Sequence, residues 1–221
     1  LQNFHFQSDG YLSAESADLY DYQVEILFSG GADAMRRQAL VPLAEFMNGR
    51  PSATSQLVDI GCGTGRFLRF AGDAQPLLRM TGVDLSAPYI DRARQSLRQR
   101  RAVSFMTGNA EQLPLADASV DVISNIFLFH ELPAQARANV VREMARVLRP
   151  GGRVLHVDTI QLGDVPRFDP LLGFFPLAYH EPYFADYVAS DLAQLYGDAG
   201  LTACSHRNAF LSKVSVFAKP D

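Results

Sequence analysis

Three closely spaced glycines mark the place in this sequence where the backbone could meet a ligand. The run Val-Asp-Ile-Gly-Cys-Gly-Thr-Gly places Gly61, Gly63 and Gly65 directly after a short aliphatic segment. Because glycine has no side chain, the backbone of such a turn can approach a bound molecule closely. A dinucleotide-binding turn would need its third glycine at position 66, where this chain has Arg66. The spacing therefore disfavours a nicotinamide dinucleotide.

Two aspartates accompany the glycine turn. Asp59 lies just before Gly61, and Asp84 ends the next aliphatic run, about 20 residues further on. A carboxylate at that second position can accept hydrogen bonds from both hydroxyls of a ribose. Either aspartate could instead cap a helix or form a turn. Taken together with the glycines, they predict a ligand that contains a nucleoside.

A histidine beside a glutamate is the candidate for proton transfer. His130 and Glu131 follow the run Phe-Leu-Phe, just beyond a segment that reads as a strand. We expect His130 to act as a general base, with Glu131 orienting its ring. Such a base is needed only when the reacting group must lose a proton. The alternative is that His130 caps or packs the helix that follows.

Two segments outside the regular pattern supply further candidates. His-Glu-Pro-Tyr183 is a polar cluster within an aromatic stretch, and we expect Tyr183 to meet a substrate. The run Tyr20-Asp-Tyr-Gln23 could close over a ligand or pack as an ordinary helix. Apolar side chains near Tyr183 suit a lid, a homodimer contact or an apolar or aromatic substrate. These side chains are Phe168, Leu171, Leu172, Phe174, Phe175, Leu177 and Tyr179.

Alternating strands and helices must position these residues. From position 56 onward, short aliphatic runs alternate with amphipathic stretches, which is typical of a mainly parallel sheet covered by helices. The last two strands are separated by Phe210 alone, so they must be antiparallel neighbours. Strands are expected at 56–60, 77–84, 102–106, 119–125, 153–158, 201–209 and 211–218. Helices are expected at 64–73, 89–100, after Pro133, and at 185–198.

These elements predict an α/β fold organised as one domain over residues 1–221. Its core would comprise about 53–158 and 185–221, with cap elements at about 1–52 and 159–184. Ligands of open α/β sheets bind beyond the carboxyl ends of the strands. We therefore expect both caps to lie over that edge.

Composition excludes several classes of protein. The chain has 221 residues, is 48% hydrophobic and 20% charged, and carries a formal net charge of -4, so it has no general attraction for nucleic acid. No run approaches the roughly 20 apolar residues of a membrane-spanning helix. Cys62 and Cys204 show no metal-ligand spacing with histidine. We expect a cytoplasmic protein without a nucleic-acid partner, a membrane span or a metal.

Five blocks of the chain resemble, in order, the motifs of class I S-adenosylmethionine-dependent methyltransferases. The resemblance is to the small-molecule branch, called methyltransferase type 11, which includes quinone-biosynthesis enzymes. It implies a Rossmann-like sheet of seven strands, mostly parallel with an antiparallel last hairpin, and helices on both faces. The blocks lie at 57–67, 82–86, 108–114, 119–125 and 146–152.

The resemblance also implies roles for individual residues. Asp59 would meet the ammonium group of S-adenosylmethionine, and Gly61 and Gly63 its methionine portion. Asp84 would bind the ribose, with Leu85 beside it. The remaining cofactor contacts would be Asn109 and Ala110 at the adenine edge and Asn125 near the sulfonium. Many relatives carry Asp at position 109, so Asn109 departs from the common pattern.

The activity implied is methyl transfer to a small-molecule acceptor by in-line displacement, with S-adenosylhomocysteine as the product. Because the sulfonium activates the methyl group, the protein has mainly to align the reactants and exclude water. Two alternatives stay open. The chain could be a non-catalytic S-adenosylmethionine-binding regulator, or another transferase that uses a nucleoside cofactor on the same fold.

Overall fold

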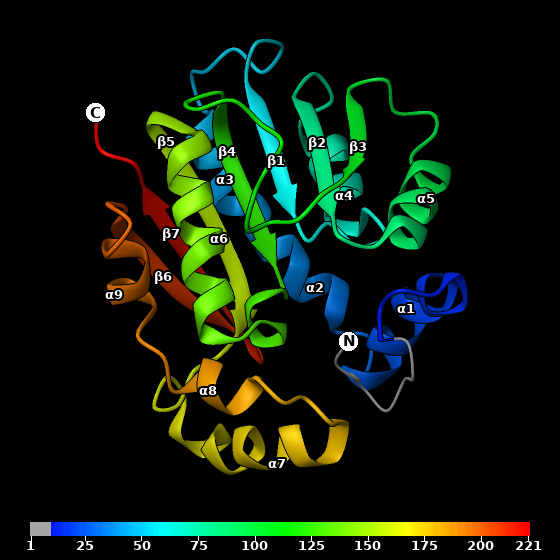
Figure 1. Ribbon diagram of the computed structural model, residues 1–221, viewed down its shortest axis with the longest axis vertical. Coiled ribbons are helices and arrows are strands. Elements are labelled where there is room, and N and C mark those ends of the chain that lie inside the picture. Colours follow the sequence, from blue (N-terminus) through cyan, green and yellow to red (C-terminus); the bar gives the residue numbers. More distant parts are fainter. Residues whose placement is uncertain (1–9) are drawn as a thin grey trace.

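A seven-stranded sheet forms the centre of the molecule (Figure 1). The computed structural model describes residues 10–221, so the first nine residues of the predicted N-terminal cap lie outside the described part. The strands are β1 (Gln56–Ile60), β2 (Arg79–Asp84), β3 (Val103–Thr107), β4 (Val120–Ile126), β5 (Leu148–Thr159), β6 (Thr202–Ala209) and β7 (Ser212–Ala218).

The strand order is β3-β2-β1-β4-β5-β7-β6. Neighbours from β3 to β5 are parallel, whereas β7 runs antiparallel to both β5 and β6. This arrangement confirms the predicted mostly parallel sheet with an antiparallel last hairpin. Strand β5 starts at Leu148, five residues before the prediction, because Leu148 pairs with Val120 across an irregularity in the ladder.

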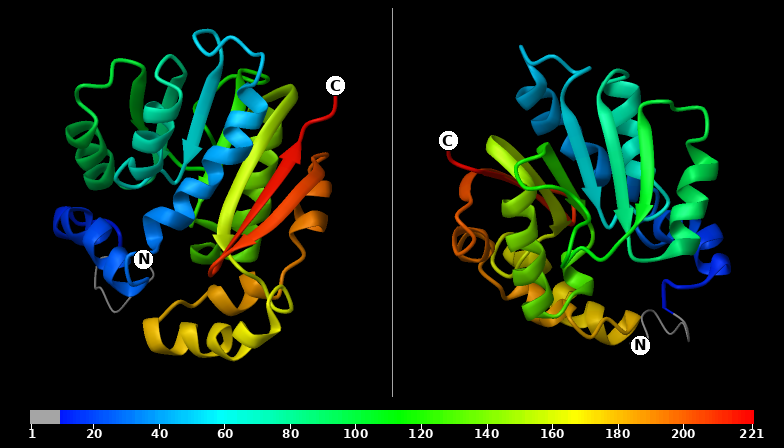
Figure 2. Two further views of the ribbon diagram at one scale, coloured as in Figure 1. Left: turned by 180° about the vertical axis from the view of Figure 1, so that it is seen from behind. Right: turned by 45° about the horizontal axis from the view of Figure 1, so that its top comes forward.

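Helices cover both faces of the sheet, as predicted. Helix α6 (Ala134–Val147) lies on the face turned to the viewer in Figure 1. Helix α3 (Leu40–Met47) crosses the opposite face, which the left view of Figure 2 shows from the front. The other helices that pack on the sheet are α4 (Arg66–Ala74), α5 (Ala87–Ser96) and α9 (Leu192–Gly197).

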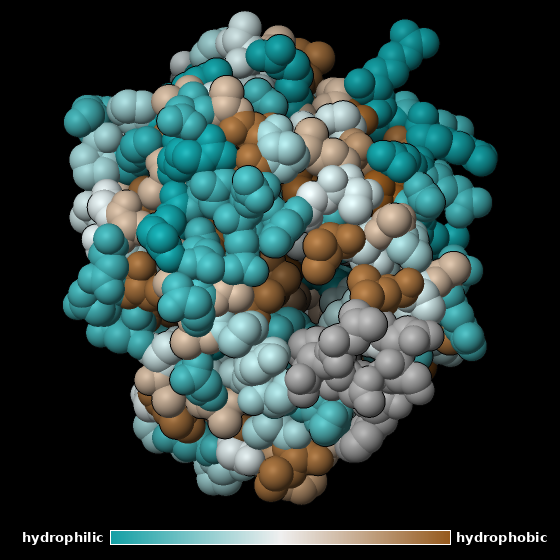
Figure 3. Space-filling view, in the orientation of Figure 1, coloured by the Kyte–Doolittle hydropathy of each residue, from teal (hydrophilic) through white to brown (hydrophobic). Residues whose placement is uncertain are grey.

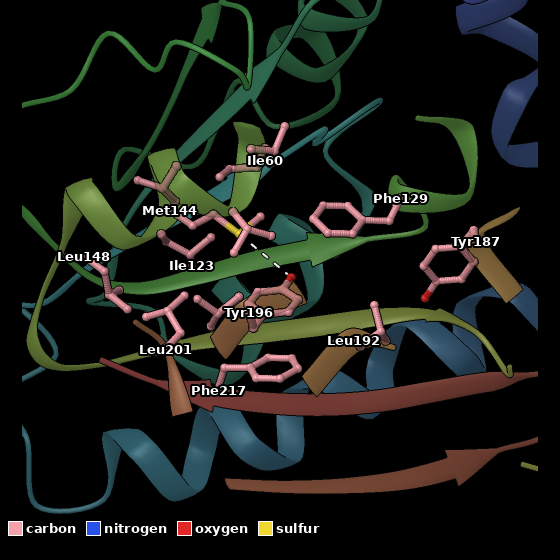
Figure 4. Close-up of a cluster of buried hydrophobic side chains, with 14 of the residues drawn as sticks. Ile60, Ile123, Phe129, Met144, Leu148, Tyr187, Leu192, Tyr196, Leu201 and Phe217 are labelled. Carbon is pink, nitrogen blue, oxygen red and sulfur yellow. Dashed lines mark hydrogen bonds between the residues drawn. The ribbon is translucent and has the colours of Figure 1, made fainter. Parts of the chain in front are cut away.

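Two apolar clusters fill the layers between the sheet and these helices. Alternation along β1 explains the division, because successive side chains of a strand point to opposite faces. Val58 belongs to the cluster under α6, shown in Figure 4, and Leu57 belongs to the cluster under α3 and α4. Tyr196 stacks on Phe217 at the base of the first cluster, with ring centroids 3.8 Å apart. The buried clusters fix the sheet on which the site is built.

The cap elements lie beyond the carboxyl ends of the parallel strands (Figure 1). The N-terminal cap contains α1 (Ala14–Leu27), α2 (Ala32–Arg36) and the 3-10 helix η1 (Arg37–Ala39). The second cap contains η3 (Pro166–Phe168), α7 (Asp169–Tyr179) and α8 (Phe184–Val188). A further 3-10 helix, η2 (Phe129–Glu131), follows β4 at the same edge.

The single helix predicted at 185–198 is wrong. The segment forms α8 and α9, separated by Ala189, Ser190 and Asp191. Ser190 Oγ donates a hydrogen bond to the carbonyl of Tyr187, and Asp191 caps the second helix by accepting from the backbone N–H of Gln194. Serine and aspartate compete with helical hydrogen bonding through such local contacts.

Within residues 10–221, no helix combines the length and the apolar character needed to cross a membrane.

Candidate active site

The glycine turn joins β1 to α4 in a left-handed backbone conformation. Gly61 and Gly63 have φ values of +69° and +53°, which residues other than glycine rarely adopt. A Cβ on Gly61 would lie 2.9 Å from Leu128, so this glycine also permits close packing. Among residues 10–221, a Cβ on Gly63 would meet only Tyr89, at 3.8 Å. The backbone at Gly63 therefore borders open space.

Asp84 links the end of β2 to this turn. One carboxylate oxygen accepts the backbone N–H of Gly63 at 2.9 Å, and the other accepts that of Ser86 at 2.9 Å. Burial raises the pKa of the Asp84 carboxyl, against the lowering effect of these backbone donors. Each oxygen keeps a second lone pair, because a carboxylate offers about four acceptor positions. Asp84 can therefore bind further hydroxyl donors.

A cavity of about 360 Å³ opens in front of the turn, and we call it the glycine cavity. Six of the eight predicted cofactor-binding residues line it. Asn109 Oδ1 already accepts the backbone N–H of Glu111 at 2.9 Å, which is a turn-forming contact. The six residues are Gly61, Gly63, Asp84, Leu85, Asn109 and Ala110.

Asp59 and Asn125 are not among the residues that line this cavity. Asp59 is 2% exposed and accepts a hydrogen bond from Ser124 Oγ at 2.6 Å. Burial raises the pKa of Asp59 to about 7. Asn125 is fully buried, and its side-chain amide has no hydrogen-bond partner among the residues that the structure describes. Their cofactor contacts stay predictions.

A second cavity, of about 430 Å³, lies between the two caps, and we call it the aromatic cavity. Its walls come from α1, α2, η2 and α7, which are far apart in the sequence. Most of the lining is apolar, and three of its polar residues, His130, Glu131 and Glu181, lie close together. The apolar side chains include Val24, Leu27, Phe28, Met35, Phe175, Tyr179 and Phe184, and the polar ones include Gln23, Arg36, His130, Glu131, Thr159 and Glu181.

The two cavities share four lining residues, Tyr11, Tyr20, Phe127 and Glu131. A group bound in one cavity can therefore meet a group bound in the other at this junction. Phe127 has a φ of +55°, an uncommon and strained conformation for an aromatic residue. Such residues cluster at functional sites, where the surrounding structure holds them in place.

The N-terminal cap is fastened over the junction by hydrogen bonds. Tyr11 Oη donates to Glu131 Oε1 at 2.6 Å, and Ser86 Oγ donates to the carbonyl of Tyr11 at 2.6 Å. Thr64 Oγ1 donates to Asp21 at 2.8 Å. Sequence reasoning missed Tyr11, although its position near the predicted tyrosine pair was a usable signal. The cap therefore connects both cavities to the glycine turn.

His130 is oriented by Asp158, and not by Glu131 as predicted. The ring Nδ1 lies 2.6 Å from Asp158 Oδ1, while Nε2 lies 3.7 Å from Glu131 Oε1. Asp158 is fully buried, and its other oxygen accepts the backbone N–H of Phe129 at 2.9 Å. The position of Asp158 at the carboxyl end of the predicted fifth strand could have revealed it from the sequence.

The charge state of His130 follows from these neighbours. Burial by itself would lower the pKa of His130, but the Asp158 carboxylate, with Glu181 and Glu131, raises it to about 10. The ring is therefore an imidazolium at neutral pH. It can serve as a base only after it has lost this proton.

One ligand atom each from His130, Glu131 and Glu181 lies within 4.8 Å of the others. A nitrogen and two carboxylates could hold a divalent cation or an organic cation at this point. The chain spacing of the three residues gives no metal motif, which explains why the sequence predicted none.

His180 follows the last residue of α7 and has a left-handed φ of 54°, so it turns the chain and brings Glu181 to the cavity.

Tyr183, like Asp59 and Asn125, is a predicted site residue that lines neither cavity. It is half-buried at the start of α8 and is absent from both linings among the described residues. Glu181, from the same His-Glu-Pro-Tyr run, lines the aromatic cavity and is 3% exposed. The catalytic role of Tyr183 stays a prediction, and Glu181 is the residue that sequence reasoning passed over.

Comparison with known proteins finds a methyltransferase family model and relatives that are named methyltransferases. Residues 58–156 match a family model described as a methyltransferase domain. A demethylmenaquinone methyltransferase from Lactiplantibacillus plantarum is 30% identical over 160 residues, which cover 71% of this chain and 64% of the relative. One from Bacillus cereus is 28% identical over 205 residues, covering 84% and 83%. The PH0226 protein from Pyrococcus horikoshii has a TM-score of 0.64 at 22% identity, covering 83% of this chain and 89% of that one.

Proposed function

We propose that this chain, which belongs to the S-adenosylmethionine-dependent methyltransferases, transfers the methyl group of that cofactor to a small-molecule acceptor by in-line displacement. The observation that carries the proposal is the meeting of two cavities at Tyr11, Tyr20, Phe127 and Glu131. One cavity is lined by six of the predicted cofactor-binding residues, and the other lies between the two caps. A methyl donor and an acceptor would face one another at the junction.

The glycine cavity suits the cofactor. The open backbone at Gly63 leaves room for the methionine portion, and the remaining lone pairs of Asp84 suit ribose hydroxyls. Leu85 and Ala110 offer apolar surface, and Asn109 would meet the adenine edge. When bound, S-adenosylmethionine supplies a methyl group on a positively charged sulfur, and S-adenosylhomocysteine is left after transfer.

The chain's own residues would contribute alignment, exclusion of water and control of a proton. The caps surround the aromatic cavity and hold an acceptor against the junction. Holding two reactants in line can supply roughly 7 to 11 kcal/mol of the barrier. Asp158 holds the His130 ring through Nδ1, so that Nε2 is the atom left for proton exchange. Tyr11 fixes Glu131 at the point where the cavities meet.

Location and assembly stay predictions that accompany this function. We propose a cytoplasmic protein with no nucleic-acid partner, organised as the one domain expected over residues 1–221. A homodimer would be compatible with helix α7, whose apolar side chains Phe174 and Leu177 are 61% and 78% exposed. Apolar side chains of this kind show at the lower end of the molecule in Figure 3.

Two measurements test the proposal. Calorimetry with S-adenosylmethionine and S-adenosylhomocysteine should show saturable binding, and incubation with methyl-labelled cofactor and a panel of small molecules should show transfer. Absence of cofactor binding at millimolar concentration would contradict the assignment of the glycine cavity. Intact cofactor binding without methyl transfer to any acceptor would favour the alternative, a non-catalytic S-adenosylmethionine-binding regulator.

A further inference from the structure

We propose that Tyr187, on helix α8, is a positioning residue that holds the ring of His130 against Asp158 during methyl transfer. The inference rests on the function proposed above, in which His130 controls a proton. Tyr187 is fully buried and lines neither cavity among the described residues, so it would act through His130 and not on a ligand. Three groups of contacts support this role: those of the His130 ring, those of the Tyr187 hydroxyl and those of the rest of α8.

Asp158 alone does not fix the orientation of the His130 ring. It holds Nδ1 at 2.6 Å, but the last torsion angle of a histidine side chain is broad. Phe184 and Tyr187 meet the imidazole edge-on, with ring centroids 6.1 and 6.5 Å away. The two residues are three positions apart and so lie on one face of α8. Together with Asp158 they enclose the ring, which keeps Nε2 on the side of Glu131 and the aromatic cavity.

The hydroxyl of Tyr187 belongs to a buried chain of hydrogen bonds. Its Oη lies 3.0 Å from His156 Nε2, and Tyr196 Oη lies 3.2 Å from the other nitrogen of the same imidazole. Tyr196 Oη also donates to Met144 Sδ at 3.9 Å, the contact that Figure 4 marks with a dashed line. All four side chains are fully buried. Burial lowers the pKa of His156 to about 4, so its ring is neutral and has one donor nitrogen and one acceptor nitrogen.

One arrangement of protons gives every O–H and N–H group of this chain a partner. Tyr187 donates to His156 Nε2, the N–H at Nδ1 donates to Tyr196, and Tyr196 donates to the Met144 sulfur. In the reverse arrangement, Tyr187 accepts from Nε2, and its own proton has no partner among the described residues. A buried donor without a partner costs free energy. The first arrangement therefore holds the Tyr187 hydroxyl in one place.

Further contacts fix helix α8 itself. The backbone carbonyl of Tyr187 accepts hydrogen bonds from Ser190 Oγ at 2.7 Å and from Gln161 Nε2 at 3.3 Å. The buried guanidinium of Arg137, on α6, lies 5.7 Å from the centroid of the Tyr187 ring and forms an ion pair with Asp186. A helix of five residues is too short to be stable alone, so these contacts set its position. Tyr187 therefore transmits the positions of the sheet and α6 to the His130 ring.

Misplacement of the His130 ring would affect turnover more than ligand binding. Proton transfer needs a donor and an acceptor within hydrogen-bond reach, and a shift of about 1 Å can cost about a hundredfold in rate. Because Tyr187 is absent from both linings in the described part of the chain, its loss removes no contact from either cavity. If Tyr187 served only to pack the core, its loss would lower stability and leave the His130 ring in place.

Nuclear magnetic resonance of the full chain tests the position of the ring without any ligand. In protein with isotopically labelled histidine, the proton between His130 Nδ1 and Asp158 should give a downfield resonance coupled to the ring nitrogen, because this hydrogen bond is short and charge-assisted. His130→Gln assigns the resonance by removing it. Tyr187→Leu, which removes the ring, should abolish the resonance, and Tyr187→Phe, which removes only the hydroxyl, should move it upfield. An unchanged resonance in both variants overturns the inference.

The matched control is Tyr196→Phe. Tyr196 is equally buried and bonds to the same histidine, but it makes no ring contact with His130 among the described residues. Both phenylalanine variants should unfold at lower urea concentration, and only Tyr187→Phe should move the His130 resonance. Equal movement in the two variants would indicate a general loosening of the core and would overturn the inference. This pair also decides the question if Tyr187→Leu does not fold.

Kinetics of methyl transfer supply a second readout. The acceptor probe is the small molecule that the panel with methyl-labelled cofactor selects. Tyr187→Leu should lower kcat at least about tenfold and leave the KM of the acceptor probe and the cofactor affinity within about threefold. Tyr187→Phe should recover part of the loss in kcat. If His130→Gln lowers kcat and Tyr187→Leu does not, the inference fails while the proposed function stands.

Two other outcomes bear on the proposed function itself. If no small molecule accepts the methyl group, methyl transfer is the claim that fails, and the His130 resonance still decides whether Tyr187 holds the ring. An unchanged kcat in His130→Gln would remove the proton role of His130 and overturn the inference with it.

Discussion

The glycine cavity and the aromatic cavity are built in different ways. The first takes just over half of its lining from positions 61–111, at the ends of β1, β2 and β3 and just after them, and the rest from the N-terminal cap and the segments after β4. The second joins the N-terminal cap, η2, the end of β5 and α7. Local sequence therefore specifies much of the glycine cavity, which is the proposed cofactor side, whereas the aromatic cavity, the proposed acceptor side, exists only after distant segments have packed together. The two sides should respond differently to mutation and to pH.

Removing Asp158 should have the largest effect, and it should fall on the acceptor side. Asp158→Ala leaves the His130 imidazolium without its buried partner, which costs about 3 to 5 kcal/mol in the free energy of unfolding. Urea unfolding measures this loss. Asp158→Asn, of the same shape, serves as the milder comparison.

Cofactor affinity of the Asp158 variants tests the independence of the two sides. We expect calorimetry to give nearly unchanged S-adenosylmethionine binding in Asp158→Asn, since Asp158 lines neither cavity. A cofactor affinity that falls in parallel with stability would show that the two sides act as one unit.

The free energy of unfolding should fall in two separate pH ranges, or windows, one for each side of the molecule. The pKa of His130 is raised from 6.5 to about 10, so its stabilisation is full below pH 6.5 and is lost as pH rises towards 10. The pKa of Asp59 is raised from 3.8 to about 7, so folding favours its protonated form. The stability that Asp59 adds at low pH is therefore lost as pH rises from 3.8 to about 7. At about 1.4 kcal/mol for each unit of pKa difference, we expect a loss of roughly 4 kcal/mol in each window, measured by urea unfolding from pH 4 to pH 10.

Single substitutions assign each window to its residue. His130→Gln should flatten the upper window and leave the lower one, and Asp59→Asn should do the reverse. If either substitution flattened both windows, the two groups would be coupled through the sheet, and the two sides of the molecule would not be independent.

Asp84→Ala should weaken S-adenosylmethionine binding by about 1 to 3 kcal/mol, because ribose hydroxyls would lose their buried acceptor. Calorimetry measures the change. Acceptor-probe binding in the aromatic cavity should stay within about twofold of the unmodified chain. The control is Asp91→Ala, an exposed position on α5, and an Asp84 variant with unchanged cofactor affinity would remove the ribose assignment.

The smallest effect is expected for Tyr183→Phe. Tyr183 lines neither cavity among the described residues, so loss of its hydroxyl should change the acceptor KM less than about twofold. Steady-state kinetics with the preferred acceptor measures it. A tenfold change would restore the substrate role that the sequence predicts for Tyr183 and would show that the acceptor site extends beyond the aromatic cavity.

Much of the fold could be predicted because its signals are local. Alternating aliphatic runs and glycine-rich turns predicted all seven strands and the antiparallel pairing around Phe210. The helix expected at 185–198 was wrong because apolar periodicity continues through Ser190 and Asp191. The Ser190 side chain bonds to the backbone at the end of the first helix, and that of Asp191 caps the start of the second. Periodicity records which face is buried, and it does not record such capping contacts.

The sequence by itself predicted six residues that line the glycine cavity, because they lie at the ends of β1, β2 and β3 or in the turns that follow, where conformation is set within a few positions of the chain. Gly63 and Asp84 are adjacent in the structure because β1 and β2 are neighbouring parallel strands. Only the tertiary structure decided which groups come together around the aromatic cavity. Asp158, Glu181 and Tyr11 come together from β5, from the turn after α7 and from the N-terminal cap, and no spacing along the chain encodes a contact between segments that meet only through packing.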